Sequence, residues 1–460
     1  MTRRNNGSLK VGSEHKVIIE KMAHEGQGIA KINGMTVFVE NSIIGETCLV
    51  KIEKAKKDYA IGKVVKILEA SPFRVAPVCR SKQCGGCNLS HMSYEGQLIF
   101  KREKVIDSLK RIGRIDAEVY DTLGMKTPYH YRNKTQHPVG VKNNRIVIGF
   151  FEKRTHNIVE IDDCLLQDPV VDKVINTVKS WMLRYDIPAY DEIAHRGLLR
   201  HVVTRVGFKT GEIMVVLVTN GREVPHVEEL VKMLLENVPV LKSFVINVNT
   251  KKTNVIMGDE NITLYGRPFI YDYIADIKYR ISPSSFFQVN PIQVEVLYDK
   301  ALEYAELTGS ETVLDLYCGI GTITLFLARR AKKVYGIEVV PEAISDAKYN
   351  AEMNGIHNVE FIQGAAEVVM PEMAEKGIKA DVIVVDPPRR GCDEKTLDAI
   401  IKASPDRIVY VSCNPATLAR DLRYLEDRGY KTEKVQPVDM FPHTSHVECV
   451  VEIQRSESSK

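Results

Sequence analysis

Cys413 is the residue whose type and position most directly suggest covalent chemistry. It stands in Ser412-Cys413-Asn414-Pro415, after the apolar run 407–411, which predicts a buried strand, and before a helical pattern. Ligands of open α/β sheets bind at the carboxyl ends of the strands. A thiol there can act as a nucleophile. It can equally fill a small apolar space, because free cysteine is among the most buried residue types.

A pattern typical of nucleotide binding lies upstream of Cys413. The run 312–316 predicts a buried strand that ends in the turn Gly319-Ile320-Gly321, and the next strand ends in Glu338, 23 residues after Asp315. The third glycine of the dinucleotide fingerprint is missing, so NAD is not favoured. An acid at this strand end can reach a ribose diol. The pattern therefore favours S-adenosylmethionine, an adenosine ligand without a pyrophosphate, over another nucleotide or none.

A further strand, 380–385, ends in Asp386-Pro387-Pro388-Arg389. The two prolines predict a rigid edge beside the ligand crevice. In amino-group methyltransferases a similar motif ends in an aromatic residue that stacks on the target base. Arg389 occupies that position here, which disfavours an exocyclic amine as the target.

A cysteine beside a methyl donor has a specific use, because C5 of a pyrimidine is a poor nucleophile. Addition of a thiolate to C6 makes C5 enolate-like and able to accept a methyl group. The C5 proton must then leave before the cysteine is eliminated, so a general base must lie nearby. Glu448, at the start of the final apolar strand 447–453, is the best candidate in the tail, with His443 and His446 as alternatives.

A second group of cysteines lies near residue 80, in the pattern Cys79-x4-Cys84-Gly85-Gly86-Cys87. This spacing around a Gly-Gly turn is typical of metal ligands, with chance clustering or reactive thiols as the alternative. Cys164 is the best candidate for a fourth ligand, because the other cysteines lie in or near the nucleotide-type motifs or in the N-terminal strands. Four thiolates suit either zinc or an iron–sulfur cluster.

Length and composition indicate an ordinary globular chain of two or three domains, with 460 residues, 44% of them hydrophobic and 27% charged. The net charge of +3 does not indicate a nucleic-acid partner, so any basic surface must be local. No apolar run approaches the roughly 18 residues of a membrane span, and no signal peptide is visible. We therefore expect a cytoplasmic protein with reduced cysteines.

The predicted elements divide the chain into three domains and an overall α/β fold. Residues 10–70 hold five short β-type runs, with a hairpin signal at Asn33-Gly34, and predict a small OB-like barrel. Small basic barrels commonly bind nucleic acid, although a solvated face fits equally well. Residues 71–285 predict a central α+β domain, and residues 286–460 alternate strand and helix as in a Rossmann-like, doubly wound sheet.

Two segments of the central domain are rich in basic residues. The segment 95–111 predicts an amphipathic helix with its lysines and arginines arranged around an apolar side. The run 129–134 interleaves aromatic and basic residues, which suits either contact with RNA or a half-exposed strand.

Four motifs together resemble the RNA uracil-5-methyltransferase family: Ser412-Cys413-Asn414-Pro415-Ala416-Thr417, Asp386-Pro387-Pro388-Arg389, Phe286-Phe287-Gln288-Val289-Asn290 and His446-Val447-Glu448. The resemblance covers essentially the whole chain, and its N-terminal part is similar to a TRAM domain, an RNA-binding barrel. It implies Cys413 as nucleophile and Glu448 as general base. It implies contacts with S-adenosylmethionine from Gln288, Tyr317, Glu338 and Asp386. It also implies a [4Fe-4S] cluster on Cys79, Cys84, Cys87 and Cys164, although some relatives have five residues in the first gap.

The combination of barrel and cluster resembles the 23S ribosomal RNA enzymes more than the shorter tRNA enzymes, which lack both. We therefore expect methylation of one or two 23S rRNA uridines by a monomer without a membrane or protein partner. A uridine of the tRNA T-loop is the second candidate. Phe286 or Phe287 is expected to stack on the flipped-out uridine or to fill its place.

Three other classes of protein fit less well. A radical S-adenosylmethionine enzyme would carry Cys-x3-Cys-x2-Cys, and a non-catalytic RNA-binding protein would lack Cys413 or Glu448. A cytosine-5 methyltransferase places its nucleophile in a different cysteine motif.

Overall fold

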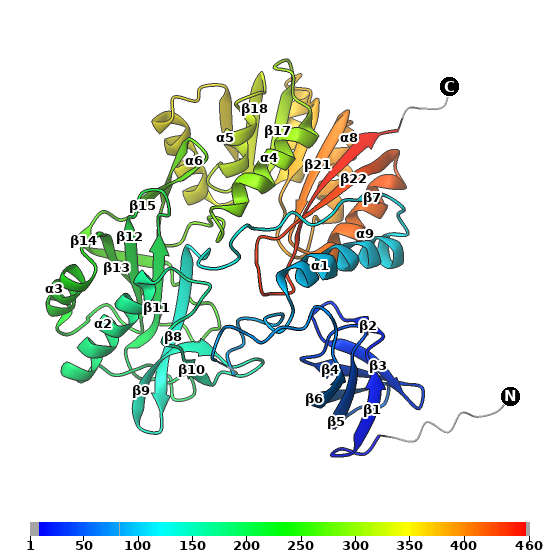
Figure 1. Cartoon of the computed structure of the whole chain (residues 1–460). Helices are drawn as coiled ribbons and strands as arrows, with labels where there is room; N and C mark the ends of the chain where they lie inside the picture. The colour runs from blue at the N-terminus through cyan, green and yellow to red at the C-terminus, as the bar shows by residue number, and fades with distance from the viewer. Residues whose placement is uncertain (1–8, 82, 457–460) are drawn as a thin grey trace.

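The computed structural model describes residues 9–81 and 83–456. Figure 1 shows an N-terminal barrel in blue, a central sheet in cyan to green, and a C-terminal α/β unit that ends in red. This confirms the predicted order of an OB-like barrel, a central α+β region and a doubly wound sheet. Within the two described ranges, no helix is long and apolar enough to cross a membrane.

The barrel is a six-stranded sheet in the order β1-β5-β6-β4-β3-β2. Asn33 and Gly34 both have positive φ and turn β3 into β4, as the hairpin signal predicts. Inward side chains such as Val37 and Val50 form its core. The strands are β1 (Glu14–Ile18), β2 (Lys21–Met22), β3 (Gly28–Ile32), β4 (Met35–Glu40), β5 (Thr47–Ala55) and β6 (Tyr59–Glu69).

The central unit is a seven-stranded sheet in the order β10-β9-β8-β11-β12-β13-β14. Two helices, α2 (Val170–Arg184) and α3 (Val227–Asn237), pack over an apolar core that contains the buried Trp181. The strands are β8 (Lys134–Lys142), β9 (Arg145–Phe151), β10 (Ile158–Glu160), β11 (Leu199–Val206), β12 (Ile213–Thr219), β13 (Leu241–Val248) and β14 (Glu260–Gly266).

The C-terminal unit is an eight-stranded sheet in the order β19-β18-β17-β20-β21-β23-β22-β7. Strands β17 to β21 run parallel, and β23 returns antiparallel to β21. The chain winds outward from β17 in both directions, so a crevice opens where β17 and β20 meet. The strands are β17 (Thr312–Leu316), β18 (Lys333–Glu338), β19 (Val359–Gln363), β20 (Val382–Val385), β21 (Arg407–Ser412), β22 (Tyr430–Val438) and β23 (Glu448–Arg455).

Helices cover both faces of this sheet, which is the doubly wound arrangement. One core contains side chains of α4 (Gln293–Ala305), α5 (Thr322–Leu327) and α6 (Pro341–Met353). The core on the other face contains side chains of α7 (Ala366–Glu375), α8 (Glu394–Ala403) and α9 (Pro415–Glu426).

The C-terminal sheet also takes a segment from early in the chain. Helix α1 (Tyr94–Ser108) continues as a π-helical turn, η1 (Leu109–Gly113), and β7 (Glu118–Val119) pairs with β22 at the edge of the sheet. Val105 and Leu109 pack in the same core as α7, α8 and α9. The C-terminal unit therefore contains residues 94–119 in addition to most of the predicted segment 286–460.

One basic residue of α1 departs from the sequence expectation. Lys101 does not lie on the outside of the helix, because its side chain is fully buried and forms an ion pair with the equally buried Asp439. The Lys101 ammonium also donates to the carbonyl of Phe441, at 3.1 Å. An unpaired buried ammonium would be very costly, so Lys101 can be buried only because these partners compensate its charge.

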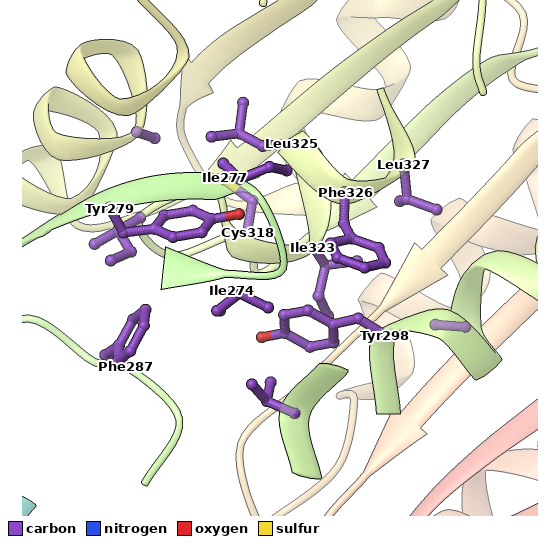
Figure 2. Packing of buried hydrophobic residues seen from close by; sticks show 14 of the residues in the cluster. Ile274, Ile277, Tyr279, Phe287, Tyr298, Cys318, Ile323, Leu325, Phe326 and Leu327 are labelled. Carbon is purple, nitrogen blue, oxygen red and sulfur yellow. The ribbon is translucent and has the colours of Figure 1, made fainter. Parts of the chain in front are cut away.

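A hairpin joins the central and C-terminal units through one continuous core. Its strands are β15 (Ile270–Ile274) and β16 (Ile277–Ile281), and Figure 2 shows their side chains packed against those of α4 and α5. The hydroxyl of Tyr279 donates to the carbonyl of Thr322 at 3.1 Å, and that of Tyr298 donates to its Oγ1 at 2.9 Å. These bonds position the first residue of α5, beside the turn that follows β17.

Candidate active site

One pocket of about 640 Å³ lies at the carboxyl ends of the parallel strands. It opens at the crevice between β17 and β20, where ligands of such sheets bind. All six residues that the family resemblance implies for catalysis and cofactor binding line this pocket: Gln288, Tyr317, Glu338, Asp386, Cys413 and Glu448.

The turn after β17 forms one wall of the pocket. Tyr317, Gly319 and Gly321 all have positive φ, so the chain turns sharply from strand to helix. The backbone N–H of Gly319 donates to Glu338 Oε2 at 3.2 Å, and the N–H of Val339 donates to Glu338 Oε1 at 2.7 Å. A Cβ at Gly319 would meet no atom within 4 Å. The turn thus borders open space beside a strand-end acid, which fits an adenosine ligand.

The pairing of β21 with β23 brings the candidate nucleophile and base together. Ser412 pairs with Cys449 at the end of the ladder. Cys413 follows Ser412, and Glu448 precedes Cys449. Because the two strands are antiparallel, Cys413 and Glu448 are therefore neighbours across the end of the ladder. Both line the pocket next to Asp386, which follows the neighbouring strand β20.

The motif around Cys413 also holds the motif around Asp386. The side-chain amide of Asn414 donates to the carbonyl of Arg389 at 3.0 Å, and the hydroxyl of Thr417 donates to the same oxygen at 3.2 Å. Asn414 also caps α9 by accepting from the N–H of Ala416. The sequence motif alone does not reveal the bond to the Arg389 segment.

Burial in the pocket favours the protonated forms of its acids. Burial and the neighbouring Asp386, opposed by Arg389, together raise the pKa of Glu448 to about 8. Burial raises the pKa of Asp386 to about 7. Burial, Glu448 and Asp386 together raise the pKa of the Cys413 thiol to about 12, against the effect of Arg389. Near neutral pH, Glu448 and Asp386 can therefore take up or release a proton at little cost.

The two phenylalanines of the 286–290 motif have different environments. Phe286 is 71% exposed and lines the pocket, whereas Phe287 is buried in the core and packs against Tyr279. The backbone carbonyl of Gln288 accepts from the side-chain amide of Asn133, at 2.8 Å. Only Phe286 is therefore placed to meet a base in the pocket.

The two histidines considered as alternative bases also differ. His443 does not line the pocket, and its ring stacks on Tyr129 at a centroid distance of 4.7 Å. His446 lines the pocket, and burial with nearby cations lowers its pKa to about 4. His446 is therefore neutral at pH 7 and stays an alternative proton acceptor, whereas the position of His443 does not suit that role.

The run 129–134 is neither a strand nor an open aromatic surface. Tyr131 is fully buried, and its hydroxyl donates to the carbonyl of Pro442 at 3.0 Å. His130 has a positive φ, and β8 begins only at Lys134. Tyr131 is therefore a core residue, whereas Tyr129 is half-buried and stacks on His443, and His130 is exposed.

The four cysteines proposed as cluster ligands lie near one another. Burial and the neighbouring thiolates of Cys164, Cys84 and Cys79 raise the pKa of Cys87 to about 12. All nine cysteines are free thiols. Four thiols fit the donor set of an iron–sulfur cluster or zinc. Among the described residues, however, no group of three or more His, Cys, Asp or Glu side chains has an arrangement that could hold a metal ion.

Sequence reasoning missed part of the pocket wall. Gly364, Ala365 and Ala366 line it after β19, and Asp393 lines it before α8. In the sequence, these residues are marked only by their position after a predicted strand or before a predicted helix. Many residues that line no pocket have such a position, so it does not identify them.

Fold and pocket together define the class of S-adenosylmethionine-dependent methyltransferases. The family model described as tRNA (Uracil-5-)-methyltransferase matches residues 93–456, and the TRAM domain model matches residues 8–65. The chain belongs to this uracil-5-methyltransferase family. It is an RNA methyltransferase that acts on C5 of uracil.

Several proteins are similar over nearly the whole chain. An uncharacterized RNA methyltransferase of Caldanaerobacter subterraneus subsp. tengcongensis is 52% identical over 97% of this chain and 99% of its own length. One of Halalkalibacterium halodurans is 55% identical over 95% of this chain and 96% of its own. The crystal structure of Pyrococcus abyssi tRNA (uracil-54, C5)-methyltransferase in complex with S-adenosyl-L-homocysteine has a TM-score of 0.77 and 30% identity, and the match covers 95% of this chain and 100% of that chain.

The electrostatics of the pocket predict a shift in pH dependence for Arg389→Gln. The Arg389 cation lowers the pKa of both Cys413 and Glu448, so its removal raises both values. The pocket then needs a higher pH to deprotonate, and the rising limb of kcat/KM against pH should move up by ~0.5–1 pH unit. The measurement is the rate of methyl transfer to RNA between pH 6 and 10.

The neighbouring Arg390→Gln is the matched control, since it removes a charge from the lining of the same pocket. We expect it to leave the rising limb in place. If the rising limb of the pH profile lies at the same pH in wild type and Arg389→Gln, Arg389 does not affect the pKa values of Cys413 and Glu448.

Proposed function

We propose that this protein methylates C5 of a uridine in 23S rRNA through a covalent bond between Cys413 and C6 of the uracil. The observation that carries the proposal is the position of Cys413 beside Glu448, in the same pocket as the strand-end acids Glu338 and Asp386. A nucleophile and an acid of raised pKa on adjacent strands are what addition and elimination at one pyrimidine require.

In this mechanism Cys413 first adds to the uracil. Its sulfur forms a bond to C6 as the electron pair of the C5=C6 bond moves into an enolate at the C4 oxygen. The thiol proton passes to Asp386, whose pKa is about 7, so that Glu448 stays free to accept the later proton. S-adenosylmethionine supplies the methyl group that C5 receives. Glu448 then takes the proton from C5, the C5=C6 double bond forms again, and the bond between C6 and the Cys413 sulfur breaks.

The remaining pocket residues have proposed roles in binding. Gln288, Tyr317, Glu338 and Asp386 are proposed to contact S-adenosylmethionine, with Glu338 at the ribose. Phe286 is proposed to stack on the flipped-out uridine or to fill its place, and its exposure at the pocket supports this choice over the buried Phe287.

The choice of RNA rests on the domain organisation. A TRAM barrel combined with four clustered cysteines supports 23S rRNA, with one or two target uridines. A tRNA T-loop uridine is the second candidate, and it is supported by the similarity to the P. abyssi tRNA (uracil-54, C5)-methyltransferase. That the protein works as a monomer stays a prediction.

Two substitutions should stop the reaction at different stages. Cys413→Ala should lower kcat by at least ~1,000-fold and abolish the covalent complex with RNA that contains 5-fluorouridine, because the attacking sulfur is gone. Glu448→Gln should still form the adduct with ordinary RNA but accumulate it in methylated form, because the C5 proton stays in place. Denaturing gel electrophoresis with labelled S-adenosylmethionine measures both.

Cys392→Ala is the matched control, because Cys392 is a buried cysteine near the pocket that does not line it. It should retain the adduct with 5-fluorouridine RNA. Full activity of Cys413→Ala would disprove the role of the nucleophile, and rapid release of product by Glu448→Gln would disprove that of the base.

A deletion strain tests the choice of RNA. Mapping of 5-methyluridine in total RNA should show loss at one or two positions of 23S rRNA and unchanged tRNA. Complementation with the wild-type gene should restore the modification, and complementation with Cys413→Ala should not. Loss from tRNA alone would instead establish the second candidate.

We also propose that Cys79, Cys84, Cys87 and Cys164 hold a [4Fe-4S] cluster. The proposal is supported by the donor type and the electrostatic proximity of the four thiols, whose side chains would have to rearrange around the cluster. Protein purified without oxygen should then contain about four iron atoms per chain, and Cys164→Ser should lose most of them. Cys48→Ala, which removes a buried cysteine of the barrel, is the control that should keep the iron. Stoichiometric zinc in place of iron would overturn the cluster assignment.

A further inference from the structure

The loop between β22 and β23, residues 439–447, carries two side chains of the pocket, Phe441 and His446. It leads directly into Glu448, the first residue of β23. The position of this loop, named the active-site loop below, therefore determines the position of the candidate base.

Side chains from other parts of the protein hold the main chain of the active-site loop. Helix α1 contributes Gln97, whose Oε1 accepts from the N–H of His443 at 2.8 Å, and Lys104, whose ammonium donates to the carbonyl of Ser445 at 2.8 Å. Asn290 donates from its amide to the carbonyl of Met440 at 3.0 Å. The loop is thus held from outside in addition to its own short-range bonds, such as that from the Thr444 hydroxyl to the carbonyl of Phe441 at 2.8 Å.

Asn88, the residue after Cys87, makes a different kind of contact with this loop. Its Oδ1 accepts from the N–H of Ser445 at 2.8 Å, and its Nδ2 donates to Ser445 Oγ at 2.9 Å. The same Nδ2 also donates to the carbonyl of Glu25 in the barrel, at 2.7 Å. One amide group therefore bonds both the barrel and the active-site loop.

The residue that follows strengthens this junction. The N–H of Leu89 donates to the carbonyl of His443 at 3.0 Å. The Leu89 side chain is fully buried, and it lies so close to Gly26 of the barrel that a Cβ there would be 2.7 Å from its Cδ2. Because the segment 88–89 contacts both, the barrel and the active-site loop cannot move relative to each other without breaking some of these contacts.

We propose that Asn88 is a positioning residue that couples the placement of the barrel and the cysteine-rich segment to the active-site loop. Gln97, Lys104 and Asn290 hold the loop from elements that pack with the C-terminal sheet, whereas Asn88 also bonds the barrel. RNA bound by the barrel would in this way favour the loop position that places His446 and Glu448 in the pocket. This inference rests on the function proposed above.

The test compares Asn88→Ala, Asn88→Asp and wild type in the full chain. Methyl transfer from labelled S-adenosylmethionine is measured with total RNA of the deletion strain as acceptor. Asn88→Ala should lower kcat about tenfold, because three hydrogen bonds are lost, while the KM for S-adenosylmethionine changes by less than about twofold. Asn88→Asp should give an intermediate kcat, since its carboxylate still accepts from Ser445 but no longer donates to Glu25.

Two further variants make the result specific. Ser445→Ala removes only the hydroxyl contact, so its effect on kcat should not add to that of Asn88→Ala. Asn237→Ala removes a comparable amide on the exposed end of α3 and should behave as wild type. If Asn88→Ala fails to fold, the kcat of Asn88→Asp still tests the bond to the barrel, because that variant loses the donor to Glu25.

The inference is overturned if Asn88→Ala keeps wild-type kcat, if its KM for S-adenosylmethionine rises together with the loss of kcat, or if the two substitutions are additive. An Asn88→Asp variant with wild-type kcat would disprove the link to the barrel. Each of these outcomes compares the rate of a variant with that of the wild type, so it does not depend on which nucleotide accepts the methyl group. A wild-type enzyme that makes no 5-methyluridine would instead refute the proposed function.

Discussion

The antiparallel pairing of β21 with β23 is the constraint on which the active site depends. Cys413 and Glu448 are 35 residues apart in the chain, and they meet because Ser412 pairs with Cys449 at the end of the ladder. A shift of this pairing by one residue would turn Glu448 to the opposite face of the sheet. The hydrogen-bonded register of two strands therefore determines whether the candidate nucleophile and the candidate base share one pocket.

Burial then gives these groups their chemistry. Glu448 and Asp386 lie in a pocket where desolvation raises their pKa values to about 8 and 7, so near neutral pH each is close to the point where it gains or loses a proton. Arg389 is the cation that opposes this effect at Cys413 and Glu448. Its backbone carbonyl accepts from Asn414 and Thr417, so the motif around Cys413 also positions the charge that lowers the pKa of Cys413.

Some elements were predictable because their patterns are local. The strand ends at Asp386 and Cys413, the Asn33-Gly34 hairpin and the glycine turn after β17 follow from apolar runs and from residues that tolerate positive φ. Long-range contacts gave no such signal. Lys101 looks like a surface lysine in any helical pattern, yet it is buried because Asp439, far away in sequence, compensates its charge. The run 129–134 was ambiguous for the same reason, since Tyr131 is buried against a loop more than 300 residues further on.

The residue types and their order in the chain were sufficient to identify the doubly wound sheet, the methyl-donor pattern and Cys413 with Glu448 as a pair of candidates, because each depends on motifs a few residues long. Tertiary structure decided that these two residues stand side by side, that Phe286 rather than Phe287 faces the pocket, and that His443 does not. It also showed Asn88 between the barrel and the active-site loop. The physical reason is that register, burial and hydrogen bonding between distant segments arise only when the whole chain packs, and no short pattern records them.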